Sequence, residues 1–351
     1  MPRAKKSSIT PFPLFKLPLV PLERIIKNWT PVEIIELSIV SRRSTNALAL
    51  IRPTVTVKMD VEIERCVTVR IFNDCKDKNP TFEWAFVHPR HSGTGKVLRN
   101  STFKNTRRYA AKTEVHQMLF PSLVYATTDR RRFEFSMKAV LDHVFKIFRN
   151  VVVDTFILDP MYDLELKDAV SCVETVNNMF IKSVRIDKSQ IYLIQNVAVT
   201  NNFVCESFQC PGGKLKDRIQ CTNLFKCMNT LWMDSSKLMH LNCRNVNLFR
   251  TRLWTLDFEN FLEAWKNSTG VQFCNVRQVK VEILNDGKSI EYSKLEAKPW
   301  NPTKRNRVYR TDDGFSIDLS RAMDIEKVDG TIGSIVLKKE IHEVCFYVWR
   351  P

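Results

Sequence analysis

The hydrophobic period of the chain changes at Pro53, and this change constrains the fold more than any other feature of the sequence. Residues 12–51 contain 21 apolar residues out of 40, many at the spacing of amphipathic helices. From Thr54 to Phe72, by contrast, apolar and polar residues alternate as they do in strands. Pro53 separates the two patterns because proline ends a helix and restricts the residue before it. We therefore expect helices followed by a β-rich region.

A helix is predicted to start at Thr30, where three local signals agree. Thr30 can cap the helix, Pro31 suits its first position, and Glu33 can complete a capping box. Apolar residues lie at helical spacing on both sides of this start: Leu22, Ile25, Ile26 and Trp29 before it, and Ile34, Ile35, Leu37 and Val40 after it. A unit of about 40 residues is too small to bury this much apolar surface alone. It either packs on the rest of the chain or binds a partner.

The same segment resembles an F-box, in particular that of the large nematode F-box family. The resemblance lies in Phe12-Pro13-Leu14-Phe15-Lys16-Leu17-Pro18 and in Leu37-Ser38 followed by Val40-Ser41-Arg42-Arg43, where the family writes FPLLKLP and LSLLSKR. Pro21 is a departure, since the family more often has a helix former there. The resemblance implies a three-helix module that docks the adaptor subunit of an SCF-type ubiquitin ligase and, through it, the cullin scaffold. It implies adaptor contacts from Leu17, Pro18, Leu19, Leu22, Ile25, Ile26, Pro31, Ile35, Leu37 and Val40, some of which must instead hold the helices together.

The rest of the chain is predicted to alternate between strands and helices. Strands are expected at residues 54–59, 66–72, 81–87, 151–158, 183–186, 245–250 and 277–284. Helices are expected along the apolar stripe from Met137 to Phe148 and at residues 164–180, 190–199 and 256–266, with a weaker strand–helix pair around 203–239. Residues 331–337 and 343–349 are predicted to form a closing hairpin. The fold class is therefore α+β, with a repeated strand–helix unit of roughly 30 residues that suggests a leucine-rich-repeat-like array.

The C-terminal half is similar to the nematode F-box-associated domain, which the family uses to recruit a protein substrate. The similarity lies in residues 236–242 and 256–266 and in the ending formed by residues 324–335 and 346–349. Phe261, Leu262 and Trp265 lie at helical spacing and are predicted to be core residues. Asp329-Gly330 and Gly333 are predicted to be turn positions. The predicted organisation is a basic tail (1–11), an F-box (12–52), a β-rich connecting region with a basic loop (53–130) and an F-box-associated α/β domain that binds the substrate (131–351).

The net charge of +16 is concentrated in three segments that contain no acidic residue. Residues 1–11, 90–112 and 297–311 are rich in Ser, Thr, Asn and Pro and follow neither a helical nor a strand period, so they are predicted to be solvated tails or loops. Proteins that read nucleic acid usually carry their charge on a groove-fitting helix or sheet among aromatic side chains. We therefore do not expect a nucleic-acid partner. The alternative function is nonetheless a basic nucleic-acid-binding protein that uses residues 90–112 and 297–311.

The sequence contains no convincing catalytic or metal site. Gly93-Thr94-Gly95-Lys96 fails as a phosphate loop because it lacks the first glycine and the final Ser or Thr. Cys205, Cys210, Cys221 and Cys227 lack the spacing of a zinc site and are predicted to be core residues. His240 and Cys243 would share one face of a helix, but nothing in the sequence indicates the orienting group and oxyanion site that a nucleophilic pair needs. Asp312-Asp313 before Gly314 is predicted to be a turn. We expect a non-catalytic protein without a cofactor or metal.

Composition predicts an intracellular protein, cytoplasmic or nuclear. No stretch approaches the ~18 apolar residues of a membrane helix, and the prolines and Lys16 within residues 12–22 argue against a signal peptide. Ten cysteines fit a reducing compartment. The expected function is that of a substrate receptor in an SCF-type ubiquitin ligase whose protein substrate the sequence does not identify.

Overall fold

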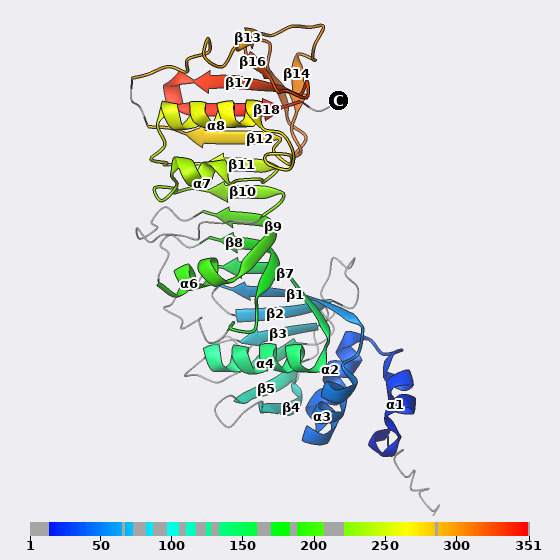
Figure 1. The fold of residues 1–351 in the computed structure, drawn as a ribbon. Helices are drawn as coiled ribbons and strands as arrows, with labels where there is room; N and C mark the ends of the chain where they lie inside the picture. The colour runs from blue at the N-terminus through cyan, green and yellow to red at the C-terminus, as the bar shows by residue number, and fades with distance from the viewer. Residues whose placement is uncertain are drawn as a thin grey trace, which may run out of the picture. The chain divides into compact units, whose positions relative to one another are not determined.

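The computed structural model describes residues 14–64, 67–72, 82–86, 97–104, 110–116, 124–127, 133–159, 170–182, 188–206, 221–284 and 287–349. The chain divides into two compact units. Unit 1 comprises Met1–Asp60 and Cys66–Val152, and unit 2 comprises Val61–Arg65 and Val153–Pro351. Both units contain helices and strands, so the α+β class is confirmed (Figure 1).

Unit 1 begins with a short 3-10 helix, η1 (Leu14–Lys16), and three α-helices: α1 (Leu19–Ile26), α2 (Pro31–Val40) and α3 (Arg42–Ile51). The predicted capping box of α2 is present, since Thr30 Oγ1 accepts from the Glu33 amide at 3.3 Å and Glu33 Oε2 accepts from the Thr30 amide at 2.8 Å. The helix α3 ends at Ile51, two residues before Pro53 as predicted.

The sheet of unit 1 contains β2 (Val67–Phe72), β3 (Phe82–Phe86), β6 (Val124–Thr127), β5 (Ala110–His116) and β4 (Val97–Lys104) in that spatial order. The strand β1 (Thr56–Ile63) precedes them and crosses the boundary between the units. The helix α4 (Phe133–Ile147) contacts β3, β4 and β5. Buried Met137, Val140 and Val144 lie along α4, so its predicted apolar stripe is a core face.

Unit 2 contains six consecutive parallel strands: β7 (Asn150–Leu158), β8 (Thr175–Ile181), β9 (Ala198–Cys205), β10 (Leu224–Cys227), β11 (Asn245–Leu248) and β12 (Gln278–Glu282). Figure 1 shows α6 (Lys188–Asn196), α7 (Ser235–Met239) and α8 (Thr255–Asn267) on one face of this sheet. Asparagine side chains connect neighbouring strands: Asn202 Nδ2 donates to Asn178 Oδ1 at 2.7 Å, and Asn223 Nδ2 donates to Asn202 Oδ1 at 2.8 Å.

Antiparallel strands complete unit 2 next to β12. The strand β18 (Glu343–Val348) pairs with β12 and with β17 (Ile332–Lys338), which confirms the predicted closing hairpin; η3 (Lys339–Ile341) connects its strands. Beyond β17 lie β16 (Met323–Glu326) and β13 (Lys298–Pro299), while β14 (Val308–Arg310) and β15 (Ser316–Asp318) form a separate pair. Phe261, Leu262 and Trp265 of α8 are buried, as predicted.

The structure corrects four local predictions. The predicted helix 164–180 is wrong at its C-terminal end, because Thr175–Ile181 forms β8 through backbone pairing with β7 and β9. The predicted helix 190–199 ends at Asn196, and β9 begins at Ala198. Residues 90–112 are not only loop, since they contain β4 and the start of β5, which pair with each other. Gly333 lies within β17 rather than in a turn, whereas Asp329 and Gly330 are in a turn as predicted.

Two predicted features are not described by the structure. The predicted strand 183–186 and the Gly93–Lys96 segment lie outside the described residues. Across the part of the chain that is described, no helix combines the length and the apolar character needed to cross a bilayer.

Candidate docking surface on the N-terminal helices

The ten residues predicted to contact a partner divide into three groups according to exposure. Leu22, Ile26, Pro31 and Ile35 are buried. Leu17 and Leu37 are half-buried. The remaining four are exposed: Pro18, Leu19 (55%), Ile25 (36%) and Val40 (70%). The structure therefore separates the buried residues of this set from the exposed ones. The sequence pattern does not distinguish the two groups.

Two exposed apolar residues on these helices were missed by the sequence analysis. Val20 on α1 is 59% exposed and Leu50 on α3 is 76% exposed. Both lie within the apolar-rich segment 12–51, so their residue types were a signal, but the sequence does not show which side chains face outward. Together with Leu19, Ile25 and Val40 they are the large exposed apolar side chains of α1–α3. We define these five residues as the docking surface.

Polar contacts position the helices α2 and α3 within unit 1. Arg43 Nη2 donates to the Phe15 carbonyl oxygen at 3.1 Å, which joins α3 to η1. A second capping box at Ser41 and Ser44 starts α3. Ser38 and His143, both buried, are joined by a 2.7 Å hydrogen bond between α2 and α4. These contacts position α2 and α3, the helices that carry Val40 and Leu50.

The His240–Cys243 pair is not arranged as a nucleophile and base. The helix α7 ends at Met239, and His240 Nδ1 lies 2.7 Å from the Ser236 carbonyl oxygen. Cys243 is fully buried, and its Sγ lies 2.9 Å from Cys221 Sγ. The hydrogen bond to Cys221 and burial raise the pKa of the Cys243 thiol, which disfavours the reactive thiolate.

Cysteine burial agrees with the prediction for three members of the cysteine cluster. Cys205, Cys221 and Cys227 are each no more than 3% exposed, and Cys210 lies outside the described residues. Within the described ranges, no group of three or more His, Cys, Asp or Glu side chains could hold a metal ion.

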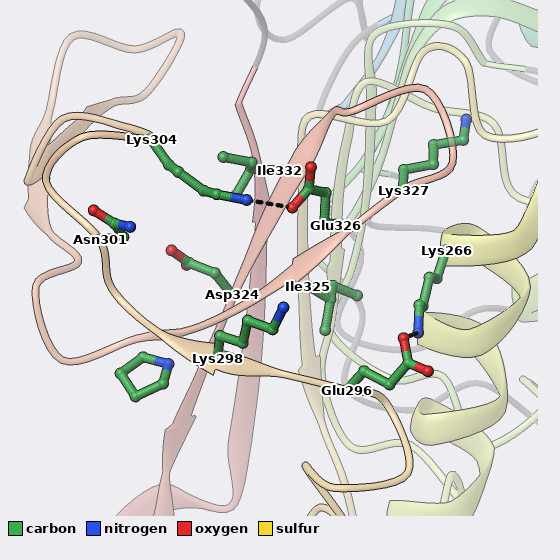
Figure 2. A pocket seen from close by; sticks show the side chains of 11 residues that line it. Lys266, Glu296, Lys298, Asn301, Lys304, Asp324, Ile325, Glu326, Lys327 and Ile332 are labelled. Atoms are coloured by element: carbon green, nitrogen blue, oxygen red, sulfur yellow. Dashed lines mark hydrogen bonds and ion pairs between the residues drawn. The ribbon is translucent and has the colours of Figure 1, made fainter.

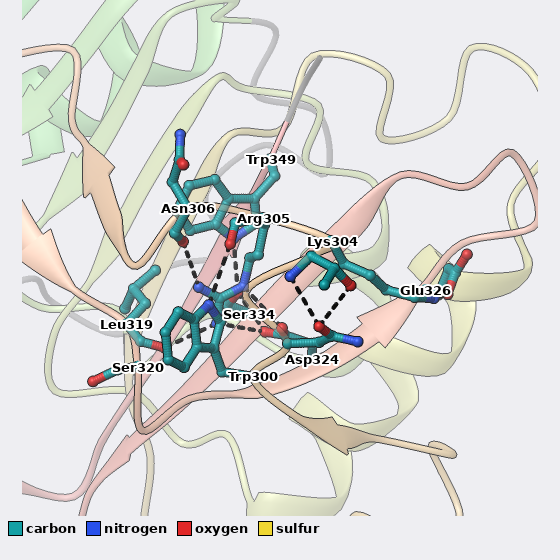
Figure 3. Close-up of polar contacts among 12 residues, drawn as sticks. Trp300, Lys304, Arg305, Asn306, Leu319, Ser320, Asp324, Glu326, Ser334 and Trp349 are labelled. Atoms are coloured by element: carbon teal, nitrogen blue, oxygen red, sulfur yellow. Dashed lines mark hydrogen bonds and ion pairs between the residues drawn. The ribbon is translucent and has the colours of Figure 1, made fainter.

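The C-terminal basic segment is largely neutralised by ion pairs within unit 2 (Figure 3). Arg305 is 7% exposed and donates from Nε and Nη2 to both carboxylate oxygens of Asp324 at 2.8 and 2.9 Å. Lys304 pairs with Glu326 at 2.6 Å, and Arg307 pairs with Asp318. The prediction of a solvated loop is therefore wrong for Arg305, because a carboxylate far along the chain compensates its burial. Arg305 also lies 4.8 Å from the ring of Trp349.

Asp312 forms an ion pair with Arg244 at the surface of unit 2. Arg244 donates from Nε and Nη2 to its two oxygens, each at 2.6 Å, and this contact lowers the pKa of Asp312. Asp312 and Asp313 precede Gly314 (φ 86°) in the turn between β14 and β15, as predicted. The Asp312 carboxylate thus links this turn to Arg244 and Asn245.

Comparison with known proteins finds relatives without an assigned activity. An uncharacterized protein of Caenorhabditis elegans is 24% identical over 96% of this chain and 79% of its own length. A second uncharacterized protein of the same organism is 20% identical over 97% of this chain and 78% of its own length. No protein-family model matches the chain, and no solved structure matches it.

Proposed function

We propose that this protein is the substrate receptor of an SCF-type ubiquitin ligase, with α1–α3 as an F-box that docks the adaptor subunit. The observation that carries the proposal is the exposure of Leu19, Val20, Ile25, Val40 and Leu50 on the three helices whose sequence resembles an F-box. Large apolar side chains exposed on one short helical unit favour an interface. The relatives found in a nematode are consistent with the nematode F-box family that the sequence resembles.

In this proposal unit 2 is the F-box-associated domain that recruits the target. Two features support a leucine-rich-repeat-like arrangement. Each strand from β7 to β12 pairs with its sequence neighbour in parallel, and helices lie on one face. Residues hydrogen-bonded between neighbouring strands are 21 to 24 positions apart from β7 to β10, within the ~20–29 residues of such repeats. The chain would act by position, raising the effective concentration of a bound target near the transferring subunits.

The test measures binding of the purified adaptor to the full chain and to a triple variant, Leu19→Ala, Ile25→Ala and Val40→Ala. All three side chains are exposed, so the variant is expected to fold normally and to lose at least tenfold in affinity, because interface hot spots cost about 2 kcal/mol each. The matched control is Val271→Ala, Val328→Ala and Ile341→Ala, three exposed apolar residues of unit 2 (83%, 74% and 55%). Equal adaptor affinity of the folded triple variant and this control would refute the docking proposal.

A further inference from the structure

A pocket of about 360 Å³ lies in unit 2 beside the strands β13 and β16 (Figure 2). Lys266 at the end of α8 and the segment from Glu296 to Lys304 form its walls. Ile325, which is fully buried, and Ile332 provide apolar lining. The pocket therefore has two isoleucines among mostly charged and polar lining residues, a composition in which a few placed charges can orient a polar group.

Lysine ammonium groups outnumber the carboxylates that are free to neutralise them. Four lysines line the pocket: Lys266, Lys298, Lys304 and Lys327. The carboxylates of the lining are Glu296, Asp324 and Glu326. Asp324 is already committed, since Arg305 binds both of its oxygens and the Ser334 hydroxyl donates to Oδ1 at 2.7 Å. Lys327 pairs with Asp329, which lies outside the lining, at 3.8 Å. Glu296 and Glu326 therefore remain for three ammonium groups, those of Lys266, Lys298 and Lys304.

Each remaining carboxylate already holds one lysine. Lys266 Nζ lies 2.6 Å from Glu296 Oε2, and Lys304 Nζ lies 2.6 Å from Glu326 Oε2. Lys298 is exposed and has no ion pair within 4.0 Å among the residues that the structure describes. Figure 2 shows its side chain between Asp324, Ile325 and Glu296, with no dashed line to any of them. Its charge adds to that of the paired lysine in lowering the pKa of both Glu296 and Glu326.

We infer that this pocket binds an acidic segment of the target protein, with Lys298 as the cation that receives a carboxylate side chain. This inference rests on the proposed function, since it names the class of target that unit 2 recruits. The unpaired Lys298 favours an anion, and half-buried Ile332 in the lining can contact the aliphatic part of a Glu side chain. Lys298 needs to break no existing ion pair to bind it, so the net gain exceeds that available to Lys266 or Lys304.

The test titrates the full chain into fluorescein-labelled hexaglutamate at 0.15 M salt and follows fluorescence anisotropy. The variant Lys298→Gln is expected to weaken binding at least tenfold. The matched control is Lys294→Gln, which removes the same charge from an exposed residue four positions away that does not line the pocket; it is expected to weaken binding less than twofold. Hexaglutamine is expected not to bind.

Three outcomes would overturn the inference. The first is an equal loss of hexaglutamate affinity in both lysine variants, and the second is no binding of hexaglutamate at all. The third is tighter binding of a single-stranded oligonucleotide of the same charge that depends on Lys298 in the same way. Adaptor affinity measured on the same variants separates this inference from the docking proposal. A Lys298-dependent peptide signal without adaptor binding upholds the pocket and refutes docking, whereas adaptor binding without a peptide signal does the reverse.

Discussion

Ser38 Oγ lies 2.7 Å from His143 Nε2, and this buried hydrogen bond joins residues 105 positions apart. Ser38 also donates to the Ile35 carbonyl oxygen at 2.6 Å, so its hydroxyl proton is used within α2. The imidazole therefore donates from Nε2 to the serine oxygen. A helix of the candidate F-box is thus tied to α4 by a specific polar contact in the core of unit 1.

Removing the hydroxyl is expected to destabilise the protein. Ser38→Ala leaves the buried Nε2–H without its acceptor, a loss of about 1–3 kcal/mol in the free energy of unfolding. Urea denaturation followed by circular dichroism measures this change. Ser293→Ala, at an exposed position, is the control and should change stability by less than about 0.5 kcal/mol. A Ser38→Ala protein as stable as the control would mean that the bond contributes nothing.

The same histidine predicts a loss of stability in mild acid. Burial, and to a smaller degree the nearby Lys146 charge, lower the pKa of His143 from 6.5 to about 4. Between these two values the unfolded chain binds a proton that the folded chain does not. The contribution of neutral His143 to the free energy of unfolding is therefore fully present above pH 6.5. It decreases as the pH falls to about 4, by about 3 kcal/mol in total.

The matched experiment compares the pH dependence of unfolding in the wild type and in His143→Gln. Carboxylates that titrate in the same range contribute equally to both proteins, so the difference between the two curves isolates His143. The wild type should lose more stability than the variant between pH 6.5 and 4. Parallel curves would show that His143 titrates alike in the folded and unfolded chain.

Two arginines two positions apart should differ sharply in their effect on stability. Arg305 has a side chain only 2% exposed and pairs with Asp324, which is 12% exposed. Arg305→Ala leaves a buried carboxylate uncompensated and is expected to cost about 3–5 kcal/mol. Arg307 pairs with Asp318 at the surface, 63% and 47% exposed, so Arg307→Ala should have a small effect because solvent screens the pair. Thermal unfolding of the two variants measures the difference in stability. Comparable losses of stability would contradict the distinction between a buried and an exposed ion pair.

Replacing Gly333 by a larger residue is expected to destabilise the protein for steric reasons. A Cβ at this position would collide with the ring of Phe346 and lie 3.1 Å from Trp265 Cη2. Gly333→Ala should therefore cost about 1–3 kcal/mol, and the added change Phe346→Leu should recover part of that loss relative to Phe346→Leu alone.

Gly330→Ala is the contrasting variant for this position. Gly330 has φ 84° and no atom within 4 Å of an added Cβ, so its substitution strains the backbone without a collision. Phe346→Leu should not relieve that strain. Rescue of both glycine variants, or of neither, would contradict the steric explanation for Gly333.

Local signals in the sequence were sufficient wherever the physical cause is local. The capping box at Thr30 and the helix end before Pro53 depend on residues within one turn. The stripe of α4 and the core residues Phe261 and Trp265 follow from periodicity, because a regular apolar face must be covered. These predictions are confirmed.

Predictions were wrong where pairing between distant residues decides the structure. Thr175–Ile181 became a strand because β7 and β9 offer backbone partners on both sides. The basic segment around β4 gave no alternation, yet β4 and β5 pair along most of their length. Gly333 was assigned to a turn because its reason, the ring of Phe346, lies on another strand.

The sequence by itself determined that a helix begins after Thr30, that the helical segment ends before Pro53 and that the chain then continues as an α+β fold. Capping hydrogen bonds and periodicity within a few residues are enough for these features. Only the tertiary structure decided which apolar side chains of those helices face outward, since Leu22 and Ile25 are equally apolar but differ in what covers them. It also decided that Arg305 is buried against Asp324, whereas Lys298 has no ion pair among the residues that the structure describes, because the described carboxylates reach the one and not the other.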